Sequence, residues 1–140
     1  MAVSFHHAGI SFRLADKQLL KKFITDSFLK ETGKKLSVGY VFCTDEYLLR
    51  INQDFLKHDY YTDIITFPLL DTDQKTEAEI YISIDRVKDN AKKLNVSADQ
   101  ELLRVIFHGL LHLAGYKDKS KKEKEMMRKK EEAWIKAYSG

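Results

Sequence analysis

The segment from Ser97 to Gly115, SADQELLRVIFHGLLHLAG, restricts the possible folds of this chain more than any other feature. Ser97 followed three residues later by Gln100 is a typical helix start, because their side chains can bond backbone N–H groups that the first turn leaves unpaired. The residues that follow are apolar on most sides of the helix that they predict, and such a helix is stable only when it is buried. The sequence therefore predicts a central helix that other elements cover.

Strand and helix patterns alternate along the rest of the chain. Alternating apolar residues and β-branched or aromatic residues predict strands at 2–7, 36–43, 64–69 and 77–85. Helical spacing of apolar residues predicts helices at about 15–33, 45–55, 85–94 and 120–138. Pro68, which has no N–H, should end its strand or mark it as an edge strand, and residues 71–76 should form a turn. Met126, Met127 and Trp134 are expected on the inner side of the last helix.

These elements predict an α+β fold, a small mixed four-stranded sheet packed with about five helices, in one domain spanning residues 1–140. A net charge of +3 gives no global attraction to nucleic acid, so any such attraction must be local. The single cysteine, Cys43, cannot form an intrachain disulfide, and the N-terminal residues lack the pattern of a signal peptide. No apolar run approaches the ~18–20 residues of a membrane span. We therefore expect a cytoplasmic protein without a membrane partner.

Two histidines interrupt the apolar helix. His108 and His112 lie four residues apart, which places their Cβ atoms ~5–6 Å from each other on one helix face, close enough to bind one zinc ion. The alternative is a chance pair that contacts only protein. Gly109 stands where zinc proteases of the H-E-x-x-H type carry their catalytic base, so the motif does not predict a protease. Glycine inside a helix costs ~1 kcal/mol relative to alanine, and we expect a strand or a substrate backbone to approach closely there.

The residues after the helix offer a third ligand. Gly115 can take a left-handed conformation and end the helix, so that the chain folds back toward the histidines. Asp118 is the only side chain in the segment 117–119 that binds metal at neutral pH, because Lys117 and Lys119 repel a cation. His108, His112 and Asp118, with a fourth position left to water, would be the arrangement of a catalytic zinc site with one ion per chain, although another divalent metal is possible.

Three blocks of the sequence resemble one known family. HGLLHLAGYKD (108–118) resembles H-G-x-L-H-L-x-G-Y-D-H, INQDFLKHDYYTDIITFP (51–68) resembles L-N-x-x-Y-R-x-x-D-x-x-T-D-V-L-S-F, and EAEIYIS (77–83) is similar to G-D-I-x-I-S. These are signatures of the YbeY family, metal-dependent endoribonucleases that act in ribosomal RNA maturation. The likeness extends from about Val38 to Trp134, in the family's order. It implies RNA, most specifically ribosomal RNA, as substrate and the ribosome or ribosome-associated proteins as partners.

The chain departs from the family pattern at two positions. Asp118 stands where the family has its third metal histidine, and a carboxylate there favours harder metals or a less acidic bound water. Leu56 replaces an arginine associated with activity, and leucine cannot contact a phosphate. Lys57 and His58 are the candidate substitutes, and Lys117 and Lys119 beside the metal loop are further candidates for substrate binding.

The resemblance implies zinc-dependent cleavage of single-stranded RNA in ribosomal RNA maturation and ribosome quality control. The catalytic groups other than the metal-bound water are not identified. Residues 117–130 contain eight Lys or Arg against three Asp or Glu, a local charge that favours phosphate binding, although such a run is also typical of a solvated helix face. Tyr60 and Tyr61 are candidates for stacking on unpaired bases or for packing. Two alternatives stay open: a ribosome-assembly factor with a structural metal and weak or no nuclease activity, and a hydrolase for another substrate.

Overall fold

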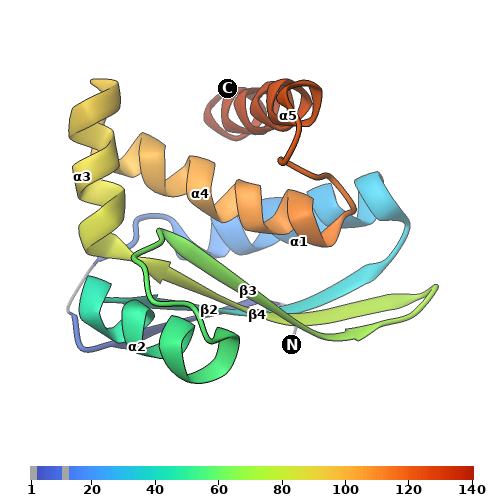
Figure 1. Ribbon diagram of the computed structural model, residues 1–140. Helices are drawn as coiled ribbons and strands as arrows, with labels where there is room; N and C mark the ends of the chain where they lie inside the picture. The colour runs from blue at the N-terminus through green and yellow to red at the C-terminus, as the bar shows by residue number, and fades with distance from the viewer. Residues whose placement is uncertain (1–2, 11–12) are drawn as a thin grey trace.

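The computed structural model describes residues 3–10 and 13–140, which form a mixed sheet and a set of helices around it (Figure 1). The strands are β1 (Val3–Ala8), β2 (Lys35–Cys43), β3 (Ile64–Asp71) and β4 (Lys75–Ser83). The helices are α1 (Lys17–Thr32), α2 (Asp45–Leu56), α3 (Ile84–Leu94), α4 (Ala98–Leu113) and α5 (Lys121–Ser139). The predicted α+β fold is confirmed. Residue 2, with which the first predicted strand begins, lies outside the described residues.

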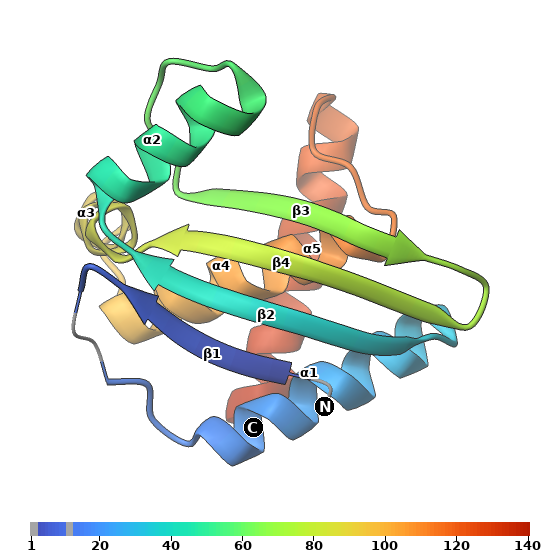
Figure 2. The same ribbon diagram turned by 90° about the horizontal axis from the view of Figure 1, so that it is seen from below.

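The strands lie side by side in the order β1-β2-β4-β3, which Figure 2 shows from below. β1 and β2 are parallel, as are β2 and β4, whereas β3 and β4 are antiparallel. Pro68 lies on β3, at an edge of the sheet, and the register shifts between Pro68 and Leu70. The prediction of an edge strand is therefore confirmed. The strand nevertheless continues to Asp71, so the turn before β4 is shorter than predicted.

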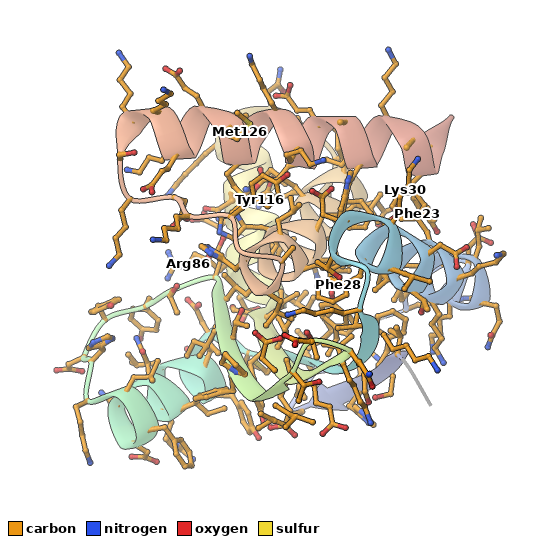
Figure 3. The ribbon with its side chains drawn as sticks, turned by 90° about the vertical axis from the view of Figure 1, so that its right-hand side faces the viewer. Phe23, Phe28, Lys30, Arg86, Tyr116 and Met126 are labelled. Carbon is orange, nitrogen blue, oxygen red and sulfur yellow. The ribbon has the colours of Figure 1, made fainter. Side chains whose placement is uncertain are left out.

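Different helices cover the two faces of the sheet. Helices α1 and α4 lie over one face, and α2 lies on the opposite side (Figures 1 and 2). The even-numbered residues of β2 and β4 face α1 and α4. Their apolar members are buried and belong to the main core: Leu36, Val38, Tyr40, Phe42, Ala78, Ile80 and Ile82. Phe28 of α1 packs into this core (Figure 3). On the other face, Leu48 of α2 packs with Cys43 and Ile65. Burial, the largest cause, raises the pKa of the Cys43 thiol to about 12.

Helix α4 is the central helix that the sequence predicts. It lies between the sheet and α5 (Figure 1), and its buried apolar residues are Leu102, Val105, Ile106, Phe107, Leu110 and Leu111. Each such side chain contributes ~1.5–3 kcal/mol when it is fully removed from water, so α4 is fixed firmly against the sheet. The Tyr40 hydroxyl donates a hydrogen bond of 3.3 Å to the carbonyl of Ile106. The hydroxyl of Ser97 accepts one from the Gln100 N–H, as expected at the helix start.

The end of the fourth strand and the position of Met126 differ from the sequence prediction. The fourth strand ends at Ser83 and not at residue 85, because the Ser83 hydroxyl accepts the N–H of Arg86 and starts α3 at Ile84. On α5, Met127 and Trp134 are 2% and 8% exposed as expected, but Met126 is 49% exposed (Figure 3). Adjacent helical positions point about 100° apart, so Met126 and Met127 cannot both face the core. None of the described helices is long and apolar enough to cross a membrane.

Candidate metal centre

One face of α4 carries a row of polar side chains. Glu101, Arg104, His108 and His112 follow one another at spacings of three or four residues, so they lie along the same side of the helix. Glu101 is buried, and the side chain of Arg104 is only 18% exposed. Helix geometry alone thus places both histidines on one line, with a charged pair one to two turns before them.

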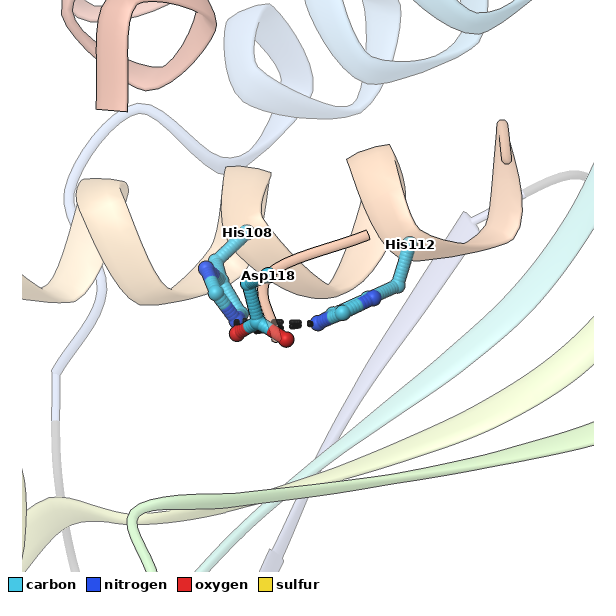
Figure 4. A group of neighbouring side chains, drawn as sticks. All are labelled: His108, His112 and Asp118. Carbon is cyan, nitrogen blue, oxygen red and sulfur yellow. Dashed lines mark hydrogen bonds and ion pairs between the residues drawn. The ribbon is translucent and has the colours of Figure 1, made fainter. Parts of the chain in front are cut away.

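The end of α4 is shaped by Gly115, whose φ of 107° is one that L side chains rarely adopt. The Gly115 N–H donates to the carbonyl of His112 and the Tyr116 N–H to that of Leu111, which satisfies two carbonyls at the helix end. The chain then folds back along the helix and brings Asp118 over the two histidines (Figure 4).

The reversal is held by contacts with distant helices. The Tyr116 hydroxyl donates to a carboxylate oxygen of Glu31 in α1 at 2.8 Å, and Lys130 of α5 donates to the other oxygen at 2.8 Å. Tyr116 therefore lies between α1 and α5 (Figure 3). The hydrogen bond from Lys130 is the main cause that lowers the pKa of Glu31, and its bond to Glu31 raises the pKa of Lys130. The loop that carries Asp118 is fixed by a charged network.

Three side-chain atoms converge at this place. His108 Nε2 lies 3.1 Å from His112 Nε2 and 3.2 Å from Asp118 Oδ2, and His112 Nε2 lies 3.5 Å from the same oxygen. Donor atoms around a tetrahedral zinc at ~2.0–2.1 Å lie about 3.3–3.4 Å apart, so the triangle has the size that a zinc ion requires. The three side chains are 18%, 33% and 37% exposed, and one side of the triangle therefore remains accessible.

The other nitrogen of His108 has a buried partner. Nδ1 lies 2.5 Å from Oε2 of Glu131, which comes from α5 and whose side chain is 2% exposed. The second oxygen of Glu131 accepts from Arg104 Nη1 at 3.3 Å, and Arg104 also donates two bonds, of 2.8 and 2.6 Å, to Glu101. The bonds to Glu101 are the largest cause that raises the pKa of Arg104, so its guanidinium stays charged.

Asp63 connects this centre with the loop before β3. Its carboxylate lies 3.9 Å from Arg104 Nη2, and its carbonyl accepts from the Ser83 N–H at 3.0 Å. Burial, opposed by Arg104, raises the pKa of Asp63 above its usual range. The loop of residues 57–63 therefore ends beside the polar face of α4.

The four candidate substrate-binding residues lie in two exposed loops. Lys57 has a left-handed backbone at the end of α2, and the ring of His58 stacks on Tyr60 at 5.1 Å between centroids. Tyr60 and Tyr61 are 56% and 50% exposed, so neither is a core residue. Lys117 and Lys119, the other two candidates, are both exposed and flank Asp118.

A family model described as Endoribonuclease YbeY matches residues 6–139. The chain belongs to the YbeY family. The protein named Endoribonuclease YbeY from Cytophaga hutchinsonii is 50% identical over 131 residues, which cover 94% of this chain and 92% of that protein. The protein of the same name from Flavobacterium psychrophilum is 39% identical over 136 residues, 97% and 96% of the two chains. The solution structure of a Thermotoga maritima protein has a TM-score of 0.64 at 27% identity, covering 97% of this chain and 88% of that one.

Within this YbeY-family chain, sequence reasoning did not single out Glu101, Arg104 or Glu131. A signal was present for each of them. Glu101 and Arg104 share the histidine face of an otherwise apolar helix, and Glu131 lies between Met127 and Trp134 at the spacing of the buried side of α5. A charged residue at such a position is buried only when it has partners, so the position itself indicates a buried polar contact.

Proposed function

We propose that this chain is a metal-dependent endoribonuclease that cleaves single-stranded RNA in the maturation and quality control of ribosomal RNA, with zinc as the bound ion. In this proposal residues 1–140 form one metallohydrolase domain that works in the cytoplasm with the ribosome or its associated proteins. The triangle formed by His108, His112 and Asp118 carries the proposal, and membership of the YbeY family supplies the reaction class.

The donor set is chemically suited to the ion. Two imidazole nitrogens and one carboxylate oxygen are common zinc ligands, and three protein ligands leave a position open, as in catalytic zinc sites. An ion bound there supplies a Lewis acid that activates water and polarises a phosphoryl oxygen. Asp118 is the most exposed of the three, so the open side of the triangle lies where a polymer from solvent can reach it.

The side chains around the triangle suit an RNA strand. Lys117 and Lys119 flank Asp118, and α5, which follows, continues the basic run. Cations of this kind neutralise phosphates, the main contribution to non-specific nucleic-acid affinity. The loop that ends at Asp63, whose carboxylate lies 3.9 Å from Arg104 Nη2, carries the exposed rings of His58, Tyr60 and Tyr61, and such rings stack well on unpaired bases. Single-stranded substrate is therefore favoured over duplex.

Leu56 favours the second candidate function, a ribosome-assembly factor with a structural metal and weak or no nuclease activity. It is the last residue of α2, is 38% exposed, and stands where the YbeY family pattern has an arginine. An apolar side chain there cannot bind phosphate. Lys57 directly after it has a left-handed backbone, so its side chain leaves the helix in a different direction.

The test uses the full-length protein on one labelled RNA, offered single-stranded and as a duplex, with zinc and with excess chelator. The variants His108→Ala, His112→Ala and Asp118→Ala remove one ligand each. His6→Ala on β1 is the matched control, because it removes an exposed histidine from another part of the molecule. Metal content is measured on each protein before the assay.

We expect about one zinc ion per chain, cleavage of the single strand only, and loss of both metal and cleavage in the three ligand variants. Cleavage that continues unchanged in metal-free Asp118→Ala protein would refute the metal-dependent mechanism. Stoichiometric zinc without cleavage, together with binding to ribosomal particles, would favour the assembly factor.

A further inference from the structure

Glu131 is a buried carboxylate that neither belongs to the ligand triangle nor faces solvent. It lies on α5, between Met127 and Trp134 along the buried side of that helix. Placing a charge there is costly unless it is paired and hydrogen-bonded. Its two oxygens contact His108 Nδ1 and Arg104 Nη1. The carboxylate from α5 therefore lies at the ring nitrogen of His108 that does not face His112 and Asp118.

The direction of the bond to His108 follows from chemistry. A carboxylate only accepts hydrogen bonds, and a neutral imidazole carries a single N–H. When His108 is the neutral imidazole that a metal ligand must be, and Glu131 a carboxylate, the ring proton lies on Nδ1, facing Oε2 of Glu131 at 2.5 Å. The lone pair is then on Nε2, the atom that lies 3.1 Å from His112 Nε2 and 3.2 Å from Asp118 Oδ2. The same contact also fixes the rotation of the imidazole ring.

Arg104 contacts the second oxygen of Glu131, with Nη1 at 3.3 Å from Oε1. Its guanidinium is shared between Glu131 and Glu101, and the bond to Glu101 is bidentate, with distances of 2.8 and 2.6 Å. The two carboxylates thus share Arg104, but only Glu131 reaches the histidine. This difference separates a structural ion pair from a group that acts on the site.

We propose that Glu131 is a positioning residue that holds His108 in its Nδ1-protonated tautomer and presents Nε2 to a divalent metal ion. The inference rests on the metal site of the proposed function and goes beyond it. Partners of this kind on metal-bound histidines also raise the basicity of the ligand, and their loss typically lowers metal affinity about 10- to 100-fold.

The first experiment needs no variant. Long-range ¹H–¹⁵N correlation spectra of the metal-free wild-type protein, at a pH of about 8 where an ordinary imidazole is neutral, identify the protonated nitrogen of His108. We expect protonated Nδ1. A proton on Nε2 in the folded protein overturns the inference, whatever the protein does to RNA.

The second experiment measures zinc affinity by competition with a chromogenic chelator. Glu131→Gln and Glu131→Leu should bind zinc about 10- to 100-fold more weakly than wild type. Glu101→Gln breaks a buried pair with the same arginine but leaves His108 untouched, so it should lower stability while its folded form keeps near wild-type zinc affinity. Glu132→Gln, an exposed neighbour on α5, should change neither.

The outcomes separate this inference from the proposed function. Equal zinc affinity in wild type and folded Glu131→Gln overturns the inference and leaves the nuclease proposal standing. Weaker zinc binding in Glu131→Gln supports the inference even when no RNA is cleaved. Failure of the wild-type chain to bind zinc overturns both. If the Glu131 variants do not fold, the wild-type tautomer decides.

Discussion

Gly109 allows a sharp test of how α4 is packed on the sheet. A Cβ atom built at this glycine would lie 2.8 Å from Ile64 Cδ1 and 3.2 Å from Ile80 Cδ1. The close approach expected at this position from the sequence is therefore made by side chains of β3 and β4. Unstrained carbon contacts are ~3.5–4.0 Å long, so in a Gly109→Ala variant the Ile64 methyl must move by roughly 1 Å.

The magnitude follows from two opposing contributions. Alanine in place of glycine stabilises a helix interior by up to ~1 kcal/mol, whereas an extra methyl in a packed core costs ~1–3 kcal/mol. Gly109→Ala alone should therefore lower the free energy of unfolding by about 1 kcal/mol. Ile64→Val removes the clashing Cδ1 atom and alone costs ~0.5–1.5 kcal/mol. In the double variant the new methyl fills the space left by Cδ1, so Gly109→Ala should there be neutral or stabilising.

Urea unfolding of the four metal-free proteins, followed by circular dichroism, measures this coupling. We expect the effect of Gly109→Ala to become more favourable by at least ~1 kcal/mol in the Ile64→Val background, with unchanged dependence on urea. Additive effects, within the ~0.3–0.5 kcal/mol seen for independent sites, would refute the packing argument.

Three further predictions concern the contacts around this core. Glu31→Gln should cost on the order of 1 kcal/mol at neutral pH. Because the folded pKa of Glu31 is lowered, that difference should be full above the unfolded pKa of ~4.3 and vanish as pH falls through the folded value; equal wild-type and variant stabilities at neutral pH would contradict this. The Cys43 thiol, with a pKa of about 12, should react with a thiol reagent only after unfolding, and rapid labelling of the native protein would disprove its burial. Ser120→Ala should lower thermal stability by ~1 kcal/mol, because Ser120 and Glu123 form a full capping box at the start of α5; an unchanged melting temperature would show that the box adds nothing.

The sequence was sufficient where the geometry is local. The helix fixes His108 relative to His112, and a glycine that tolerates positive φ reverses the chain within a few residues, so the approach of Asp118 followed from short-range rules. The element types followed similarly from periodicity. The boundary at Ser83 could not be predicted from periodicity, because Ser83 is both the last residue of β4 and the N-cap of α3.

Long-range pairing could not be predicted in the same way. The parallel order β1-β2-β4 joins segments far apart in the chain, and no local pattern specifies which strands become neighbours. The pairing of Glu131 has the same cause: its place between Met127 and Trp134 indicates burial, but nothing on α5 indicates that Arg104 and His108 of α4 become its partners. The convergence of the three metal-ligand candidates was thus predictable, and the buried partners of His108 were not.

The spacing of the three metal-ligand candidates has a consequence for folding. His108, His112 and Asp118 lie within one short segment, so even an unfolded chain keeps them close together; if they bind zinc as proposed, the unfolded chain would retain part of that affinity. The contacts of Glu131 and Glu31 with this segment form only on folding. Only the difference between folded-state and unfolded-state affinity stabilises a protein. Zinc should therefore raise the unfolding temperature by less than its affinity for the folded chain implies. The difference between the expected and the observed rise measures the zinc affinity of the unfolded chain.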